Sequence, residues 1–213
     1  MMKKQFTMSF FDAPITNVVP QCECSVEQVY QLITRDETLR LLTEQVRNAA
    51  DLRRAKASLL PFVTPCGTFS RRNSQSLVAP SGLVVIDVDH LDSYDEAVAM
   101  RRALFDDPLL HPVLTFISPS GRGVKAFVPY DTSSTLLDAS TAIVDAATEA
   151  ALQVNRIVEN LKYAMEFTRL LYDNAATSTA PTASRKGVDL SGKDIVRACF
   201  LSYDADALFR NEA

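Results

Sequence analysis

The sequence predicts an α/β (α+β) fold in which helices flank a sheet. The strongest observation is the run Gly-Leu-Val-Val-Ile-Asp-Val-Asp at residues 82–89, an unbroken apolar stretch typical of a strand buried on both faces in the middle of a sheet. Apolar residues at helical spacing before and after this run predict the flanking helices. A length of 213 residues suffices for one large domain, and 47% hydrophobic with 23% charged residues is ordinary for a globular protein.

The first part of the chain is expected to combine a strand with three helices. Ser25 and Gln28 resemble a capping box at a helix start. The expected elements are a strand ending at Phe11, a loop at 12–24, a helix from Val26, and helices at 37–48 and 49–59. We interpret residues 1–60 as a strand and helical region packed on a core of residues 61–213, in one compact unit.

The core is expected to alternate between strands and helices. Residues 136–172 contain neither Gly nor Pro, and as a single helix they would be about 55 Å long, so we expect a bend or two helices. The other expected elements are an extended segment at 62–69 interrupted at Gly67, a helix at 94–105, strands at 113–117 and 124–129, a mobile loop at 174–186, and strands within 187–190 and 195–203.

The net charge of −4 excludes nucleic-acid binding by bulk attraction, so such binding would need a local basic patch. Between Arg47 and Arg72 the sequence has six basic residues and one acidic residue. This excess is either a solvated helix face or a strip that binds a phosphate backbone. The candidate nucleic-acid-binding residues are Arg53, Arg54, Lys56, Arg71 and Arg72.

The cysteines and the hydropathy pattern exclude several classes of protein. Four scattered cysteines form no Cys-x-x-Cys pair, and only two histidines are present, so we expect reduced thiols and no zinc site. The apolar run in the first eleven residues is too short for a signal peptide, and no segment reaches the ~18 apolar residues of a membrane span. These observations predict a cytoplasmic protein with no membrane partner.

Asp87 and Asp89 are candidate metal ligands and catalytic residues. Residues two apart in a strand point to the same side, so both carboxylates leave the buried strand on one face. Two carboxylates about 5 Å apart repel by roughly 3 kcal/mol at an effective dielectric of 20, and a divalent cation removes that repulsion. We expect Mg²⁺ or Mn²⁺ bridging to a nucleoside triphosphate. The alternative is the polar end of a strand followed by a helix cap.

A loop rich in serine and glycine is the candidate nucleotide-binding site. Its two glycines allow backbone N–H groups to turn towards an anion, and its serines add hydroxyl donors. It lacks the spacing of a Walker loop and leads into a strand, so an ordinary hairpin turn is the alternative. The candidate residues are Ser118, Ser120, Gly121, Arg122, Gly123 and Lys125.

A late acidic segment offers a third metal ligand. Asp189 would complete an acidic triad with Asp87 and Asp89, and Arg197 could reach a phosphate with its fork of donors. The same segment contains Asp194, Ser202 and Asp204.

In this order the motifs resemble the VirE-N-terminal-type domain of bacterial mobile-element and phage-like proteins, related to the archaeo-eukaryotic primase (primase-polymerase) superfamily. The resemblance rests on the segments at 82–92, 118–127 and 194–204. It implies a primase-polymerase-like core with an RRM-like sheet, acting in DNA replication of a mobile element. It further implies Asp87, Asp89 and Asp189 as ligands of Mg²⁺ or Mn²⁺, a DNA or RNA template, and a helicase domain or protein as partner.

One departure from that superfamily keeps other functions open. The superfamily carries a histidine where this chain has Lys125, and lysine neutralises a phosphate without the directional contact of an imidazole. The first alternative is therefore an inactive nucleotide- or nucleic-acid-binding module of the same fold. A phosphohydrolase or sugar transferase that uses Asp-x-Asp is the second.

Overall fold

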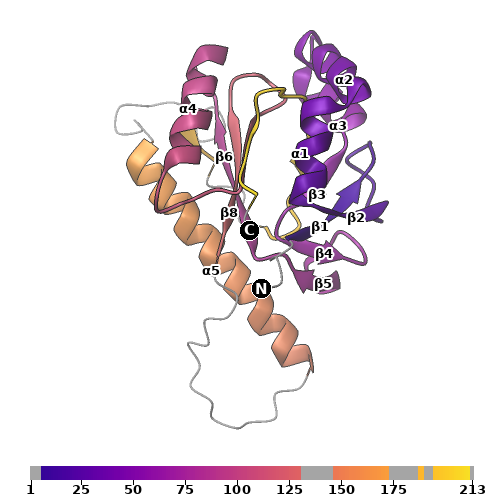
Figure 1. Ribbon diagram of the computed structural model, residues 1–213. Coiled ribbons are helices and arrows are strands. Elements are labelled where there is room, and N and C mark those ends of the chain that lie inside the picture. Colours follow the sequence, from indigo (N-terminus) through magenta and orange to yellow (C-terminus); the bar gives the residue numbers. More distant parts are fainter. Residues whose placement is uncertain (1–5, 131–145, 173–186, 190–193, 212–213) are drawn as a thin grey trace.

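The computed structural model describes residues 6–130, 146–172, 187–189 and 194–211 (Figure 1). The predicted combination of α and β structure is confirmed: helices flank antiparallel sheets. No helix in the described part of the chain is long and apolar enough to cross a membrane.

A four-stranded antiparallel sheet and three helices form the N-terminal part of the structure. The strands lie in the order β10 (Cys199–Phe200), β3 (Phe62–Thr64), β1 (Thr7–Phe11) and β2 (Cys22–Ser25). The helices are α1 (Val26–Arg35), α2 (Glu37–Arg47) and α3 (Leu52–Leu59). The predicted capping box is present at the start of α1, where the backbone N–H of Gln28 donates to Ser25 Oγ and that of Ser25 donates to Gln28 Oε1.

Two expectations for this region are wrong in detail. Residues 22–24, predicted as loop, lie in β2 and pair with β1. The sequence Cys-Glu-Cys-Ser has no strand pattern of its own, and its pairing with the buried strand β1 makes it extended. Helix α3 begins at Leu52, three residues later than predicted, because the side chain of Asp51 caps it by accepting from the Arg54 N–H.

The central sheet has five antiparallel strands in the order β11 (Leu208–Phe209), β7 (Leu114–Ile117), β8 (Val124–Pro129), β6 (Leu83–Asp89) and β9 (Gly187–Val188). Along the chain, α4 (Tyr94–Asp106) lies between β6 and β7, and α5 (Ala146–Tyr172) lies between β8 and β9. This β-α-β-β-α-β order, with β6 and β8 in the middle, has the topology of an RRM-like sheet. Figure 1 shows both helices on one side of this sheet and the N-terminal part on the other.

Strand β6 is buried on both faces, as its composition predicted. Val84, Ile86 and Val88 pack in one apolar cluster with residues of α4 and α5. Leu83 and Val85 point the opposite way, into a second cluster that includes residues of β1, α1 and α2. Asp87 and Asp89 continue this second face, so they lie on the side of the sheet turned towards the N-terminal part.

Several expectations for the core need correction or lie outside the described residues. The described part of 136–172 is one helix, α5, of about 40 Å; residues 136–145 and the loop predicted at 174–186 are not described. The break in the extended segment, predicted at Gly67, falls at Pro65 and Cys66, between β3 and β4 (Gly67–Phe69). Strand β4 pairs with β5 (Leu77–Pro80), and the short 3-10 helix η1 (Ser74–Ser76) lies between these two strands in the chain. Within the expected strand at 195–203, only β10 is a strand.

The segment after β10 is held by side-chain contacts that join the two sheets. Ser202 Oγ donates to the Ile117 carbonyl at 2.7 Å, and the backbone N–H of Asp204 donates to Ile33 of α1 at 2.8 Å. The Asp204 carboxylate accepts two contacts from Arg101 Nη1, at 2.6 and 2.7 Å, and one from the Ile117 N–H at 2.8 Å. These bonds replace a strand ladder and explain why the strand prediction is wrong there.

Candidate metal centre

Three acidic side chains from neighbouring strands converge at one edge of the central sheet. In the antiparallel pairing of β6 with β9, Asp89 lies opposite Gly187, and the backbone N–H of Asp189 donates to the Asp87 carbonyl at 2.8 Å. One carboxylate oxygen from each of Asp87, Asp89 and Asp189 lies within 4.8 Å of the others. The structure therefore brings the late acid beside the early pair, and the three acidic residues could hold a metal ion.

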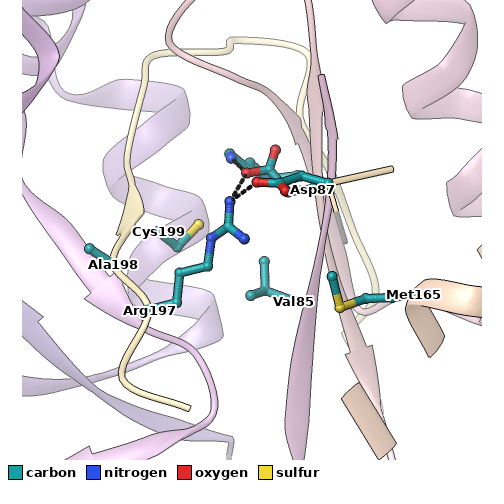
Figure 2. Close-up of a pocket in the computed structure, with 8 residues that line it drawn as sticks. Val85, Asp87, Met165, Arg197, Ala198 and Cys199 are labelled. Carbon is teal, nitrogen blue, oxygen red and sulfur yellow. Dashed lines mark hydrogen bonds and ion pairs between the residues drawn. The ribbon is translucent and has the colours of Figure 1, made fainter. Parts of the chain in front are cut away.

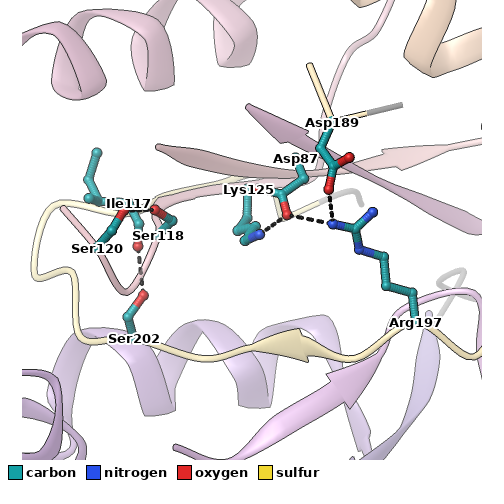
Figure 3. Close-up of polar contacts among 8 residues, drawn as sticks. All are labelled: Asp87, Ile117, Ser118, Ser120, Lys125, Asp189, Arg197 and Ser202. Carbon is teal, nitrogen blue, oxygen red and sulfur yellow. Dashed lines mark hydrogen bonds and ion pairs between the residues drawn. The ribbon is translucent and has the colours of Figure 1, made fainter. Parts of the chain in front are cut away.

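Two cations already contact these acids (Figure 3). Lys125 lies directly opposite Asp87 in the pairing of β6 with β8, and its Nζ donates to Asp87 Oδ2. Arg197 approaches from the segment before β10, where its Nη2 contacts Asp189 Oδ2 and lies 3.3 Å from Asp87 Oδ2. The side chains of Asp87 and Lys125 are 8% and 11% exposed, so this pair is nearly buried.

The second oxygen of Asp87 is buried and lacks a partner. Its Oδ1 has no hydrogen-bond donor in the described part of the chain, although Oδ2 serves both cations. A buried carboxylate oxygen without a donor is costly, and such groups are rare in folded proteins. Hard divalent cations take oxygen ligands of this type, so the donor set could hold such an ion.

The electrostatics of the cluster follow from burial and from these neighbours. Burial raises the pKa of Asp89, and the charge of Asp87 raises it further. Burial lowers the pKa of Lys125, but the charges of Asp87 and Asp89 outweigh it, so the pKa of this ammonium lies above its ordinary value. Burial lowers the pKa of Lys56, with a further lowering by Lys125. Of the described cations, Lys125 and Arg197 form direct ion pairs with Asp87 and Asp189.

A pocket of about 260 Å³, open to solvent, adjoins the acids (Figure 2). It lies between β6 and the segment that carries Arg197, and Val85 and Met165 form its apolar wall. Only about 10 Å³ of this space is free for the centre of a water-sized sphere, which is room for about one water or ion. Phosphate groups, or any larger ligand, would therefore extend beyond the pocket.

The serine- and glycine-rich loop lies next to Asp89 but uses two of its amides internally. The Gly121 N–H donates to the Ser118 carbonyl at 2.9 Å, in a turn that needs the positive φ of 72° at Gly121. The Arg122 N–H donates to Ser120 Oγ at 3.2 Å, and Arg122 Nε donates to the Leu91 carbonyl. The sequence suggested that such amides face an anion, and these two do not.

Gly123 places the loop against the acids. A Cβ at this position would lie 2.4 Å from the Val88 carbonyl oxygen, 2.8 Å from Ser118 Oγ and 2.9 Å from Asp89 Oδ1. Ser118 itself is buried and its Oγ lies 3.1 Å from Ser120 Oγ. The loop therefore lies beside Asp89, with its backbone at Gly123 close to that carboxylate.

The structure separates the five predicted nucleic-acid-binding residues into groups. Arg53, Arg54 and Arg71 are exposed. Lys56 feels the charges of the acidic cluster, and its Nζ lies 5.6 Å from the Phe200 ring centroid. Arg72 has a structural contact, because its Nη2 donates to the Ile15 carbonyl at 2.7 Å and its guanidinium lies over the Phe62 ring.

Sequence reasoning missed the contact between Arg47 and the serine-rich loop. Arg47 Nε donates to the Pro119 carbonyl at 3.3 Å, and its guanidinium lies 5.8 Å from the Tyr94 ring centroid. Arg47 ends α2, and 72 residues separate it from Pro119. No local pattern could have indicated a contact over that separation.

Comparison with known proteins identifies a family and corrects one expectation. The family model described as BT4734-like, N-terminal domain, matches residues 54–209, which include all three acids, Lys125 and Arg197. No curated protein and no solved structure matches significantly. The VirE-N-terminal-type assignment, and with it the primase-polymerase relationship, is therefore wrong. Asp-x-Asp and Ser-x-Ser-Gly are short motifs, and their order along a chain does not define one family.

Proposed function

We infer that this chain, which belongs to the family of BT4734-like N-terminal domains, is a divalent-metal-dependent nucleotidyltransferase domain. It would transfer the nucleotidyl group of a nucleoside triphosphate to a hydroxyl group of DNA or RNA and release pyrophosphate, a reaction of the primase or polymerase type. The convergence of three carboxylates carries the proposal, together with the buried Asp87 Oδ1, which has no donor among the described residues.

The residues that would hold Mg²⁺ or Mn²⁺ are Asp87, Asp89 and Asp189. A divalent ion bound there supplies charge that polarises phosphate oxygens and favours the deprotonated form of an attacking hydroxyl. Lys125 and Arg197 lie beside these acids and supply positive charge for the phosphates, Arg197 with a fork of donors that matches two oxygens.

Nucleic acid would approach along α3. Arg53 and Arg54 are exposed on this helix, and the Nζ of Lys56 lies 5.6 Å from the ring centroid of Phe200 in β10. Such side chains would contact the phosphate backbone of a template without reading its sequence. We leave Arg72 out of this proposed contact, because its guanidinium already donates to the Ile15 carbonyl and lies over the Phe62 ring.

One observation favours a second candidate, a module that binds nucleotides without turnover. Lys125 and Arg197 already neutralise Asp87 and Asp189, so the acids form a closed ion-pair network without any metal. A protein could retain such a network for recognition alone. Product formation distinguishes the two candidates, whereas nucleotide binding does not.

The test is extension of a labelled primer on a template, with all four nucleotides and Mg²⁺ or Mn²⁺. The wild-type chain should form product, and Asp89→Asn should reduce the rate about a hundredfold or more, because it weakens the metal site and leaves the fold intact. Asp106→Asn, which changes an exposed acid paired with Arg102, is the matched control and should retain the rate.

The possible outcomes separate the candidates. Absence of product, together with Mn²⁺-dependent nucleotide binding that Asp89→Asn abolishes, would establish the binding module instead. Absence of both product and metal-dependent binding would refute the metal site itself.

A further inference from the structure

We propose that Arg197 is an exchangeable counter-ion, which occupies the cation position between Asp87 and Asp189 when no metal is bound and moves to the triphosphate when metal enters. Metal and nucleotide would then bind cooperatively. The inference rests on the metal site of the proposed function, and it assigns to Arg197 the coupling between the two ligands.

The first observation is the position of one nitrogen atom. Arg197 Nη2 contacts Asp189 Oδ2 and lies 3.3 Å from Asp87 Oδ2, so a single cationic group bridges carboxylates from two neighbouring strands. A metal ion that bound both acids would have to occupy this region. Two cations so close together repel each other strongly in a partly buried site, so the guanidinium and the metal exclude one another.

The second observation explains why Arg197 moves and Lys125 does not. Lys125 is part of the central strand β8, lies in register with Asp87, and its side chain is 11% exposed. Arg197 belongs to no strand, its side chain is 26% exposed, and it reaches the acids from the opposite side (Figure 3). Lys125 can therefore remain on Asp87 Oδ2 while Oδ1, which has no donor, turns to the metal.

The third observation is the charge balance of the cluster. Without ligands, Asp87 and Asp189 form ion pairs with Lys125 and Arg197. A divalent ion alone adds positive charge and displaces Arg197 from its partners. A triphosphate that binds without metal lies beside acids whose negative charge is only just neutralised, so the site offers it little net positive charge. When both ligands bind, the charges of the metal and the triphosphate offset each other, and the released guanidinium gains a phosphate as its partner. Each ligand then favours binding of the other, which is positive coupling between the two sites.

The experiment measures binding of Mn²⁺ by electron paramagnetic resonance of the free ion, with and without a non-hydrolysable nucleoside triphosphate analogue. In the wild-type chain the analogue should tighten Mn²⁺ binding about tenfold or more. In Arg197→Gln, Mn²⁺ alone should bind more tightly than to the wild type, and the tightening by the analogue should largely disappear. Arg197→Lys keeps the positive charge and should leave binding of Mn²⁺ alone as weak as in the wild type.

A matched control is Arg102→Gln, which removes an arginine from an exposed ion pair on α4 and should behave as the wild type. Unchanged or weaker binding of Mn²⁺ alone to Arg197→Gln, with the coupling retained, would overturn the role of Arg197 while the metal site stood. If Asp89→Asn left Mn²⁺ binding unchanged as well, the proposed function would fail instead.

Discussion

Replacing Asp204 by asparagine should lower the free energy of unfolding by about 3–5 kcal/mol, because it leaves the buried charge of Arg101 without a carboxylate. The side chains of Arg101 and Asp204 are 7% and 1% exposed, so solvent cannot take over the lost interaction. Asparagine keeps the shape of the side chain. The loss therefore reports on charge and hydrogen bonding and does not reflect a cavity.

The predicted loss of unfolding free energy includes contacts of Asp204 other than its ion pair with Arg101. Asp204 also accepts the Ile117 N–H at 2.8 Å, and its backbone N–H binds Ile33, so the residue joins α4, β7 and α1. Replacing Arg101 by Met and Asp204 by Leu together removes both charges, and it should recover part of the loss. It should not recover all of it, because the buried Ile117 N–H would still lack an acceptor, at about 1–3 kcal/mol.

The assay is equilibrium unfolding in urea, with the dependence on denaturant compared between variants to confirm that the folded states are alike. For a chain of this length the melting temperature of Asp204→Asn should fall by roughly 6–20 °C. The control is Asp106→Asn, whose exposed pair with Arg102 should contribute less than about 1 kcal/mol. A loss below about 1 kcal/mol for Asp204→Asn would refute the view that this pair holds the C-terminal segment in place.

Two further predictions concern the loop and the thiols. Gly123→Ala should lower the free energy of unfolding by about 1–3 kcal/mol and weaken Mn²⁺ binding, because the new Cβ would lie 2.4 Å from the Val88 carbonyl oxygen and 2.9 Å from Asp89 Oδ1. Denaturation and metal titration measure the two effects. Wild-type values in both measurements would contradict the position of the loop beside Asp89. Of the four cysteines only Cys22 is exposed, and burial raises the pKa of the other three thiols to about 12, so at pH 8 they carry almost no thiolate. A chromogenic thiol reagent should react rapidly with one thiol and with the other three only after unfolding. Cys22→Ser should remove the rapid phase. Rapid reaction of more than one thiol in the folded chain would contradict the burial of the other three cysteines.

Much of the local structure could be predicted because it depends on short-range periodicity. The apolar run at 82–89 indicated a doubly buried strand, and the spacing of Asp87 and Asp89 placed both carboxylates on one face, since successive side chains of a strand alternate. Ser25 and Gln28 indicated a helix start because their mutual contact spans only three residues.

The contacts between distant segments could be guessed only in part. That Asp189 would join the early acids was a hypothesis from residue type, and the pairing of β9 with the edge of β6 placed it there. The position of Arg197 between Asp87 and Asp189 had no sequence signal. Resemblance of short motifs misled the family assignment, because such motifs recur without common descent.

The sequence by itself therefore determined which residues share a face and where most helices begin, because backbone geometry couples neighbours at periods of 2 and 3.6 residues. Only the tertiary structure decided that an arginine and a lysine, rather than solvent, neutralise the acids. It also decided that the backbone N–H groups of Gly121 and Arg122 donate hydrogen bonds within the serine- and glycine-rich loop. Those outcomes depend on burial and on the pairing of segments far apart in the chain, and no local sequence pattern indicates which distant segments pair.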